Sequence, residues 1–140
     1  MIVGIGTDIV AVERIRQSLQ RHDGRIAQRI LRPAELEEFE QRNEKVRPHF
    51  LAKRFAAKEA AAKALGTGFR DGIQMQQIEV AHDRQGKPQL QWSGAAQQQF
   101  ERLRVKAAHL SISDEESHAV AFVVLESLVE SLMESMEESH

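Results

Sequence analysis

The chain lacks cysteine altogether, so its 140 residues hold neither a disulfide scaffold nor a zinc site built from thiolates. It also lacks an apolar run long enough to cross a bilayer, and its first residues do not show the basic-then-apolar pattern of a secretory leader. We therefore expect a cytoplasmic protein with no membrane segment. A chain of this length can bury a core without cross-links, which favours a single main domain.

The glycine-rich nucleotide-binding fingerprints are missing as well. Gly4-Ile5-Gly6 would need a third glycine at the position of Ile9. Gly66-Thr67-Gly68 follows a predicted helix and lacks the Lys-Ser/Thr pair of a P-loop. Nucleophile elbows, zinc-protease helices and calcium loops are also absent. The sequence therefore does not indicate an enzyme that supplies its own nucleophile.

Charge is distributed unevenly although the formal net charge is only -2. Six arginines lie between Arg14 and Arg32, where Asp23 is the only acid. The C-terminal end carries five glutamates from Glu126 to Glu138 and no lysine or arginine. An arginine-rich face of this kind fits an acidic protein, a nucleic acid or a solvated surface, and composition alone leaves these alternatives open.

The first half of the chain alternates between strand and helix patterns. A short β-branched run at 2–10 predicts a buried strand, and apolar spacing predicts a helix at 11–20 and a short helix before Pro33. Pro33 is typical of a first helical turn and begins the next helix. Residues 50–65, rich in alanine, lysine and arginine and free of glycine and proline, form the clearest helix.

The second half predicts strands at 73–81 and 88–92, a helix from Ser93 to about residue 106, and a hairpin of strands at 108–113 and 119–125. This irregular alternation favours an α+β fold, a compact antiparallel sheet packed with helices. We expect one domain over residues 1–126. Residues 127–140 then form an acidic tail whose apolar residues recur at helical spacing.

Two separated carboxylates are the main candidates for chemistry. Asp8 lies near the end of the first strand, and Glu59 lies on the clearest helix between Lys58 and Lys63. Magnesium takes oxygen ligands and is often held by only one or two carboxylates together with substrate phosphates. The lysines would neutralise the remaining phosphate charge. This combination predicts a divalent cation that grips a phosphate.

Ordinary structural roles are open for the same residues. Glu59 and Lys63 are four residues apart and could form a surface ion pair. Asp8 could cap the following helix or pair with Arg14. On the strand near the C-terminus, alternation places three polar side chains on one face, which could be a hydrated surface or part of a substrate site: His109, Ser111 and Ser113. Asp114 at the end of that strand could be a base or a neighbour of a phosphate.

Three segments together resemble the holo-acyl-carrier-protein synthases, the small bacterial type of 4′-phosphopantetheinyl transferase. They are Gly4-Ile5-Gly6-Thr7-Asp8-Ile9-Val10, then Arg54-Phe55-Ala56-Ala57-Lys58-Glu59-Ala60 with Lys63, then Ala64-Leu65-Gly66-Thr67-Gly68. The resemblance runs in order from Ile2 to about Ser127 and includes Gly86-Lys87-Pro88 and the final hairpin. It implies the transferase fold and transfer of 4′-phosphopantetheine from coenzyme A to a serine of acyl carrier protein, for fatty acid biosynthesis.

The resemblance also implies roles for particular residues. Asp8 and Glu59 would hold magnesium against the coenzyme A pyrophosphate, and Lys63 would contact the phosphates and assist the leaving group. Lys58 would contact a phosphate or support Glu59. The family's coenzyme A cleft corresponds here to two groups of residues: Gly66, Thr67 and Gly68, and His109, Ser111 and Ser113. Members of the family form trimers with clefts between subunits.

The resemblance further implies that the helix after the first strand binds the acidic carrier protein, for which we expect the arginines Arg14, Arg25 and Arg29. It implies no nucleic-acid or membrane partner. Some family members have a histidine, considered as the base, where this chain has Asp114; Asp114, Glu59 or a metal-bound water could each accept the serine proton. A hydrolase that cleaves a nucleotide pyrophosphate with water, and a non-catalytic module that binds an acidic partner, are the competing hypotheses.

Overall fold

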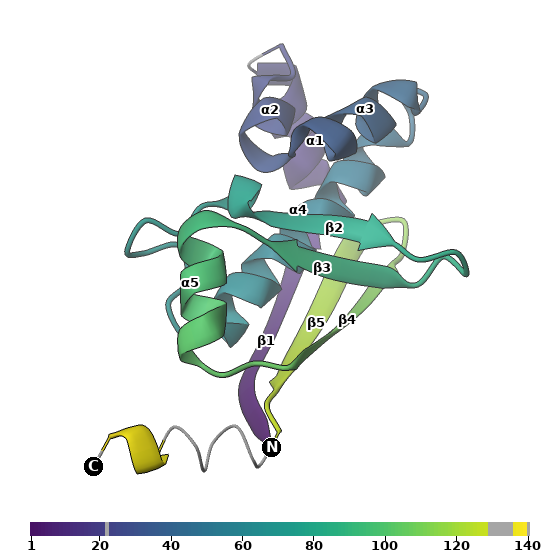
Figure 1. Ribbon diagram of the computed structural model, residues 1–140. Coiled ribbons are helices and arrows are strands. Elements are labelled where there is room, and N and C mark those ends of the chain that lie inside the picture. The colour runs from purple at the N-terminus through teal and green to yellow at the C-terminus, as the bar shows by residue number, and fades with distance from the viewer. Residues whose placement is uncertain (22, 129–135, 140) are drawn as a thin grey trace.

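The computed structural model describes residues 1–21, 23–128 and 136–139, which form two antiparallel sheets and the helices around them (Figure 1). The larger sheet has the strand order β1-β5-β4, with β1 at Ile2–Ala11, β4 at Ala107–Asp114 and β5 at His118–Glu126. The smaller one is the hairpin of β2 (Ile78–His82) and β3 (Pro88–Trp92). The predicted α+β class is confirmed, although the strands divide into two sheets rather than one.

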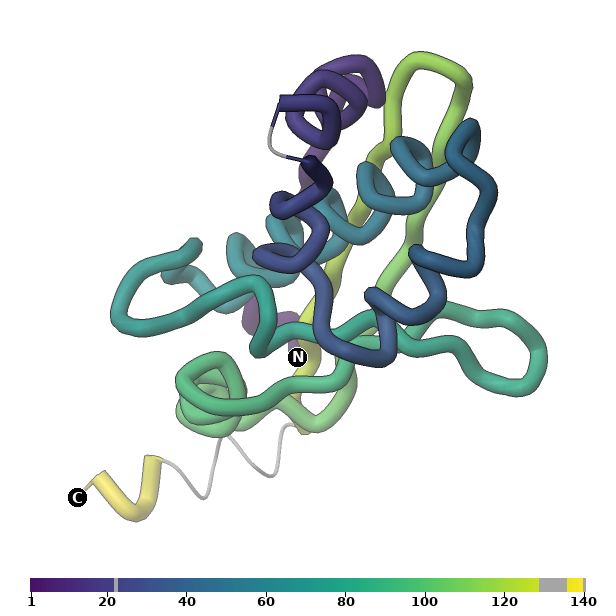
Figure 2. The backbone as a smooth tube through the Cα atoms, turned by 90° about the horizontal axis from the view of Figure 1, so that it is seen from above, coloured from purple at the N-terminus to yellow at the C-terminus, as the bar shows by residue number. Residues whose placement is uncertain are grey.

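Within residues 1–21 and 23–128, five α-helices surround the sheets: α1 (Val12–Arg21), α2 (Arg25–Ile30), α3 (Pro33–Gln41), α4 (Arg47–Ala64) and α5 (Gly94–Arg102). In Figure 1, α1, α2 and α3 gather above the β2–β3 hairpin, and α5 lies beside that hairpin. Figure 2 shows the turn between β4 and β5 next to the start of α4. Two contacts hold this turn: the Val12 N–H donates to Ser117 O at 2.9 Å, and His49 Nε2 lies 3.0 Å from Glu116 O.

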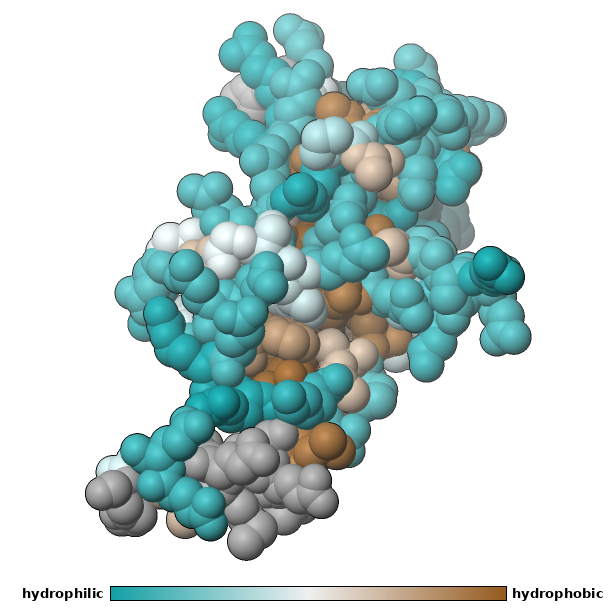
Figure 3. Space-filling model, in the orientation of Figure 1, coloured by the Kyte–Doolittle hydropathy of each residue, from teal (hydrophilic) through white to brown (hydrophobic). Residues whose placement is uncertain are grey.

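Helix α4 packs on one face of the larger sheet. Alternate residues of β5 on that face are 0 to 1% exposed: Ala119, Ala121, Val123 and Leu125. The facing side of α4 is mostly alanine and is equally buried. Figure 3 shows that hydrophilic side chains cover most of the surface in this view, with apolar side chains gathered in the middle. The core therefore lies between α4 and the sheet.

Two predicted element boundaries are wrong by four or more residues. The strand predicted from residue 73 begins at Ile78, because a short 3₁₀ helix, η1 (Met75–Gln77), precedes it. The Gln77 side chain bonds the backbone of Gly72, Gln74 and Ala96, which competes with strand pairing. Helix α5 ends at Arg102 rather than near residue 106, because Arg104 takes a left-handed conformation with φ 59°.

The acidic tail falls mostly outside the described residues. Residues 129–135 and residue 140 lie outside the described part of the chain, so the predicted amphipathic helix there stays a prediction. At the start of the tail, Ser127 is 1% exposed and forms two backbone hydrogen bonds with Met1. The Ser127 N–H donates to Met1 O at 2.8 Å, and the Met1 ammonium donates to Ser127 O at 2.6 Å. The chain therefore remains anchored to the body up to Ser127.

Glycine at two positions of β1 allows α4 to approach the sheet very closely. A Cβ placed on Gly6 would lie 1.9 Å from the carbonyl oxygen of Ala60, and one on Gly4 would lie 2.0 Å from that of Ala64. Real Cβ atoms do not tolerate such distances from a backbone atom. Any side chain at these two positions would therefore force α4 away from β1.

We expect Gly6→Ala to lower the free energy of unfolding by about 3 kcal/mol, because an added methyl group meets rigid backbone rather than a flexible side chain. Urea denaturation measures this change. Gly24→Ala is the matched control: its φ of 80° makes alanine unfavourable, but no atom lies within 4 Å of the new Cβ. It should cost only about 1 kcal/mol. Equal losses for the two variants would contradict the close-contact explanation.

Candidate active site

The close contact between β1 and α4 brings three charged side chains together. Residues 4, 6, 8 and 10 of β1 face α4, so Asp8 lies on the same side as Gly6. Lys63 of α4 reaches across with its Nζ 3.1 Å from Asp8 Oδ1 and 2.9 Å from Thr7 O. The Asp8 side chain is 16% exposed and that of Lys63 is 50% exposed, so the group is open to solvent at the Lys63 side.

Glu59 belongs to the same group. Its pKa is raised first by partial burial and then by repulsion from the Asp8 carboxylate, while Lys63 and Arg14 oppose the increase. Asp8 and Glu59, 51 positions apart in the sequence, are therefore close enough to repel each other. The structure thus brings the two predicted metal ligands to one place.

The donor set fits a small hard cation. Two carboxylates that repel each other are stabilised by a positive charge between them, and the Lys63 ammonium already contacts one of them. Carboxylate oxygens are the ligands that Mg²⁺ prefers, and Mg²⁺ often takes its remaining ligands from water and substrate phosphates. Among the described residues there is no group of three or more His, Cys, Asp or Glu side chains that could hold a metal. A site here would therefore depend on non-protein ligands for most of its coordination.

The structure contradicts the predicted phosphate contact of Lys58. Its side chain is 0% exposed, and its Nζ donates to Glu35 Oε1 at 2.6 Å and to Ile30 O at 2.6 Å. A fully buried ammonium cannot reach a bound substrate. The sequence analysis did not identify Glu35, the partner that makes this burial possible.

The glycine turn ends α4 one helical turn beyond Lys63. Gly66 and Gly68 have φ values of 82° and 60°, and the Gly68 N–H donates to Ala62 O at 3.0 Å. This is the usual way in which glycine terminates a helix. Thr67 is half-buried, and its backbone oxygen accepts a bond from Arg70 Nε at 2.9 Å. The turn is thus well placed near Lys63, and its role as a substrate contact stays a prediction.

The polar residues of β4 lie elsewhere. His109, Ser111 and Ser113 pair with Val124, Phe122 and Val120 on the face of the sheet opposite α4, and all three are exposed. Within one chain, these residues do not join Asp8 and Glu59. They border an apolar area on the same face, formed by Ile5, Ile9, Val120 and Phe122, which are 37 to 66% exposed.

Asp114 lies in a third place, a basic cleft of about 630 Å³. Its charged lining comes from α3–α4 and the β2–β3 hairpin: Arg42, His49, Lys53, Arg54 and His82. Burial and then the Arg54 charge lower the pKa of His82, as expected beside several cations. The sequence reading did not find this cleft. The only available signal was Lys53-Arg54 at the start of the Glu59 motif.

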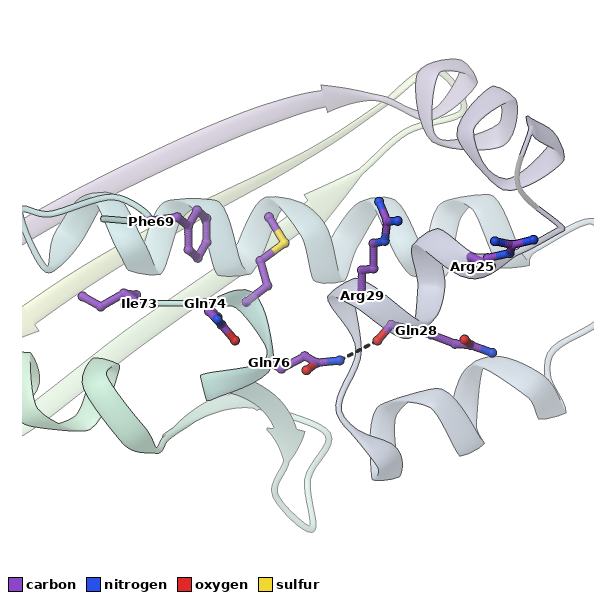
Figure 4. A pocket seen from close by; sticks show the side chains of 8 residues that line it. Arg25, Gln28, Arg29, Phe69, Ile73, Gln74 and Gln76 are labelled. Carbon is purple, nitrogen blue, oxygen red and sulfur yellow. Dashed lines mark hydrogen bonds between the residues drawn. The ribbon is translucent and has the colours of Figure 1, made fainter. Parts of the chain in front are cut away.

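The predicted docking arginines occupy two neighbouring helices. Arg14 lies exposed on α1, directly after β1, and its charge reaches Glu59. Arg25 and Arg29 lie on α2 rather than on the helix that follows the first strand. They border a pocket of about 570 Å³ whose apolar lining is Phe69, Ile73 and Met75 (Figure 4). This surface combines positive charge with an apolar floor.

Among the described residues, no helix is both long enough and apolar enough to cross a membrane.

Comparison with known proteins identifies the family. The model of the 4′-phosphopantetheinyl transferase superfamily matches residues 4–123. A holo-[acyl-carrier-protein] synthase of Halorhodospira halophila is 56% identical over 125 residues, which cover 89% of this chain and 98% of that protein. One of Vibrio cholerae is 49% identical over 126 residues, covering 90% of this chain and 98% of that protein.

Solved structures agree with these relatives. The holo-[acyl-carrier-protein] synthase of Neisseria meningitidis superposes with a TM-score of 0.83 at 45% identity, covering 91% of this chain and all (100%) of that one. The Bacillus anthracis synthase in complex with coenzyme A (3′,5′-ADP) gives a TM-score of 0.77 at 40% identity, covering 91% and 99% of the two chains. The chain therefore belongs to the holo-[acyl-carrier-protein] synthases of the 4′-phosphopantetheinyl transferase superfamily.

Proposed function

We propose that the protein transfers 4′-phosphopantetheine from coenzyme A to a serine of apo-acyl carrier protein and releases adenosine 3′,5′-bisphosphate. This reaction serves fatty acid biosynthesis. The observation that carries the proposal is the meeting of Asp8, Glu59 and Lys63 at one open site. It suits a reaction in which the attacking hydroxyl comes from the second substrate, so that the enzyme supplies positioning and charge neutralisation.

Asp8 and Glu59 are the residues that would hold Mg²⁺. When bound, Mg²⁺ would offset the negative charge of the pyrophosphate oxygens. Lys63 is half exposed and carries its charge on a flexible stem, so it can turn from Asp8 to the phosphate of the leaving group. Its present contact with Asp8 supports this role, because the ammonium lies beside the carboxylates where negative charge must be neutralised.

The base that accepts the serine proton has two protein candidates in different places. Glu59 has a raised pKa, which makes its carboxylate a better proton acceptor than an ordinary glutamate. Asp114 lies in the basic cleft on another part of the chain. In a reaction centred on Asp8 and Glu59, Asp114 would have to come from a neighbouring copy.

A trimer is part of the proposal, and the outer face of the larger sheet supports it. That face presents Ile5, Ile9, Val120 and Phe122 to solvent, beside the row of His109, Ser111 and Ser113. Contiguous apolar surface on a small protein marks a contact with another molecule. Packing copies through this face would bring the polar row of one copy toward the site of the next, and the basic cleft would then offer its cations to the phosphates of coenzyme A.

Carrier-protein docking completes the proposal. Arg25 and Arg29 offer positive charge beside an apolar pocket, and Arg14 adds a third charge on the neighbouring helix α1, which suits an acidic helix that carries an apolar side chain. Arg14 lies close enough to affect the Glu59 pKa, so a partner bound to α1 and α2 would place its serine near the carboxylates.

We expect Asp8→Asn and Glu59→Gln each to lower kcat by about 100-fold or more, because each removes charge from the site that neutralises the pyrophosphate. Mass spectrometry of apo-acyl carrier protein incubated with coenzyme A and Mg²⁺ measures the transfer. Glu101→Gln, an exposed glutamate on α5, is the control and should keep wild-type turnover. Coenzyme A cleavage that leaves the carrier mass unchanged would favour the hydrolase, and absence of Mg²⁺-dependent coenzyme A binding would favour the non-catalytic module.

Stability gives a second readout for Glu59→Gln. The raised pKa means that ionised Glu59 is less favourable in the folded than in the unfolded protein, so its cost appears as pH rises above the ordinary value of 4.5. The variant should therefore melt above the wild type at pH 7 without Mg²⁺, and this difference should shrink below pH 4.5. Added Mg²⁺ should raise the Tm of the wild type but not of the variant; equal shifts would contradict the metal assignment.

Charge reversal should separate the docking arginines from the coenzyme A site. We expect Arg14→Glu and Arg25→Glu to raise KM for the carrier protein about tenfold or more while KM for coenzyme A changes little, because like charges then oppose an acidic partner. Steady-state kinetics with each substrate varied in turn measures both constants. Arg102→Glu on α5 is the control. Equal increases in both constants would argue against docking on α1 and α2.

The proposed assembly predicts that Phe122→Glu yields monomers with little transferase activity, because burying the new carboxylate between copies is costly. Light scattering after size-exclusion chromatography measures the mass, and circular dichroism checks the fold. Gln91→Glu, on the exposed side of β3 in the smaller sheet, should leave the assembly intact. A wild-type protein that is monomeric and fully active would refute the shared site.

A further inference from the structure

Glu35 and Lys58 form a buried ion pair that the proposed chemistry does not use. They are 1% and 0% exposed, and Lys58 Nζ lies 2.6 Å from Glu35 Oε1. Glu35 Oε1 also accepts the Arg32 N–H at 3.0 Å, and Oε2 accepts the Val80 N–H at 3.2 Å and lies 3.3 Å from Arg54 Nε. Lys58 gives a further bond to Ile30 O at 2.6 Å.

Stability alone is a poor explanation for such a pair. Removing two charges from water costs several kcal/mol for each ion, and apolar side chains of similar size often replace buried pairs without loss. Burial lowers the pKa of Lys58 despite the opposing effect of Glu35, which reflects this desolvation. What apolar side chains cannot reproduce is the set of directed bonds to fixed backbone atoms. The pair defines the relative positions of the segments that it joins.

One of those segments is the helix that carries two docking arginines. Helix α2 has only six residues, and its N-cap, Gly24, makes no side-chain cap bond. A helix this short is unstable in isolation, so contacts with the rest of the protein must set its position. Lys58 supplies such a contact at Ile30 O, where the last carbonyls of a helix lack partners and its dipole favours a cation.

The other end of this contact is the helix of the carboxylate site. Lys58 immediately precedes Glu59 on α4. Figure 4 shows α2 lying along α4, with Arg29 and Arg25 projecting from α2. The Gln76 side chain of η1 donates to the Gln28 backbone oxygen at 2.5 Å, so α2 is attached to η1 as well as to α4. The docking arginines and Glu59 are thus connected through the Lys58 side chain.

We propose that Glu35 and Lys58 are positioning residues that hold α2 on α4, so that Arg25 and Arg29 present the carrier protein in register with Glu59. The inference rests on the proposed function, because that function makes Arg25 and Arg29 docking residues. The attachment of α2 to α4 through Lys58 is a property of the fold itself. If Glu35 and Lys58 hold α2 in place, then removing this buried pair should weaken the affinity for the carrier protein and not that for coenzyme A.

The test is the double variant Glu35→Gln with Lys58→Met, which removes both charges together and keeps one amide oxygen that can accept either the Arg32 N–H or the Val80 N–H. We expect a Tm close to the wild type, KM for the carrier protein raised at least about fivefold, as is typical of coupling between two sites, and KM for coenzyme A within twofold. Arg25→Glu should then have a smaller effect in this background than in the wild type. Glu38→Gln is the matched control, because Glu38 pairs with the same Arg54 from α3 but is half exposed and, among the described residues, makes no hydrogen bond or ion pair with α2.

An unchanged carrier KM in the folded double variant would overturn the proposal. A second measurement needs no variant: in the wild-type protein, the amides of α2 from Ala27 to Leu31 should exchange hydrogen nearly as slowly as those in the middle of α4. Exchange as fast as in an exposed loop would also overturn it. Absence of transfer by the wild type would remove the proposed function instead, and faster exchange of α2 in the double variant than in the wild type would still decide whether the pair holds α2, which Gln76 also contacts.

Discussion

The backbone contact between β1 and α4 brings together the charged side chains of the proposed active site. Because Gly4 and Gly6 have no side chains, the strand lies directly against the alanine face of α4. Asp8 follows on the same side of the strand, and Lys63 and Glu59 follow on the near side of the helix. The three charged groups meet because the backbones of β1 and α4 are in contact. If the strand and the helix were further apart, Asp8 and Glu59 could not share one cation.

Neighbouring charged residues on α4 have different roles because a helix turns by about 100° per residue. Lys58 points into the core and is fully satisfied by Glu35 and Ile30 O. Glu59, one position later, stays at the edge, where partial burial and then repulsion from Asp8 raise its pKa. A buried charge with complete bonding suits a fixed contact, whereas partly exposed charges can exchange one partner for another. Neighbouring residues of α4 thus provide a fixed contact at Lys58 and partly exposed charges at Glu59 and Lys63 that can bind a substrate.

Much of this arrangement is predictable from the sequence, and the reasons are local. The first strand, the long helix and the final hairpin each have a clear pattern of apolar and polar residues in the sequence. The structure contains all of them, as β1, α4 and the β4–β5 hairpin. The partner of Lys58 was not predictable, because Glu35 lies 23 positions earlier on a helix whose orientation no periodicity reveals. The end of α5 was missed for a similar reason: Arg104 adopts the left-handed conformation that usually signals itself with glycine.

Strand alternation explains why the predicted substrate residues separate in a single chain. The side chains of β4 alternate between the two faces, so His109, Ser111 and Ser113 turn away from α4 while Leu110 enters the core. A sequence pattern cannot tell which molecule covers the outer face. An outer face with exposed isoleucine, valine and phenylalanine is poorly suited to water, and its polar row at the edge is of little use to the chain's own carboxylates. A second copy packed on this face would account for both the apolar area and the polar row. Association would bury the apolar area, and the polar row of one copy would complete the active site of the next.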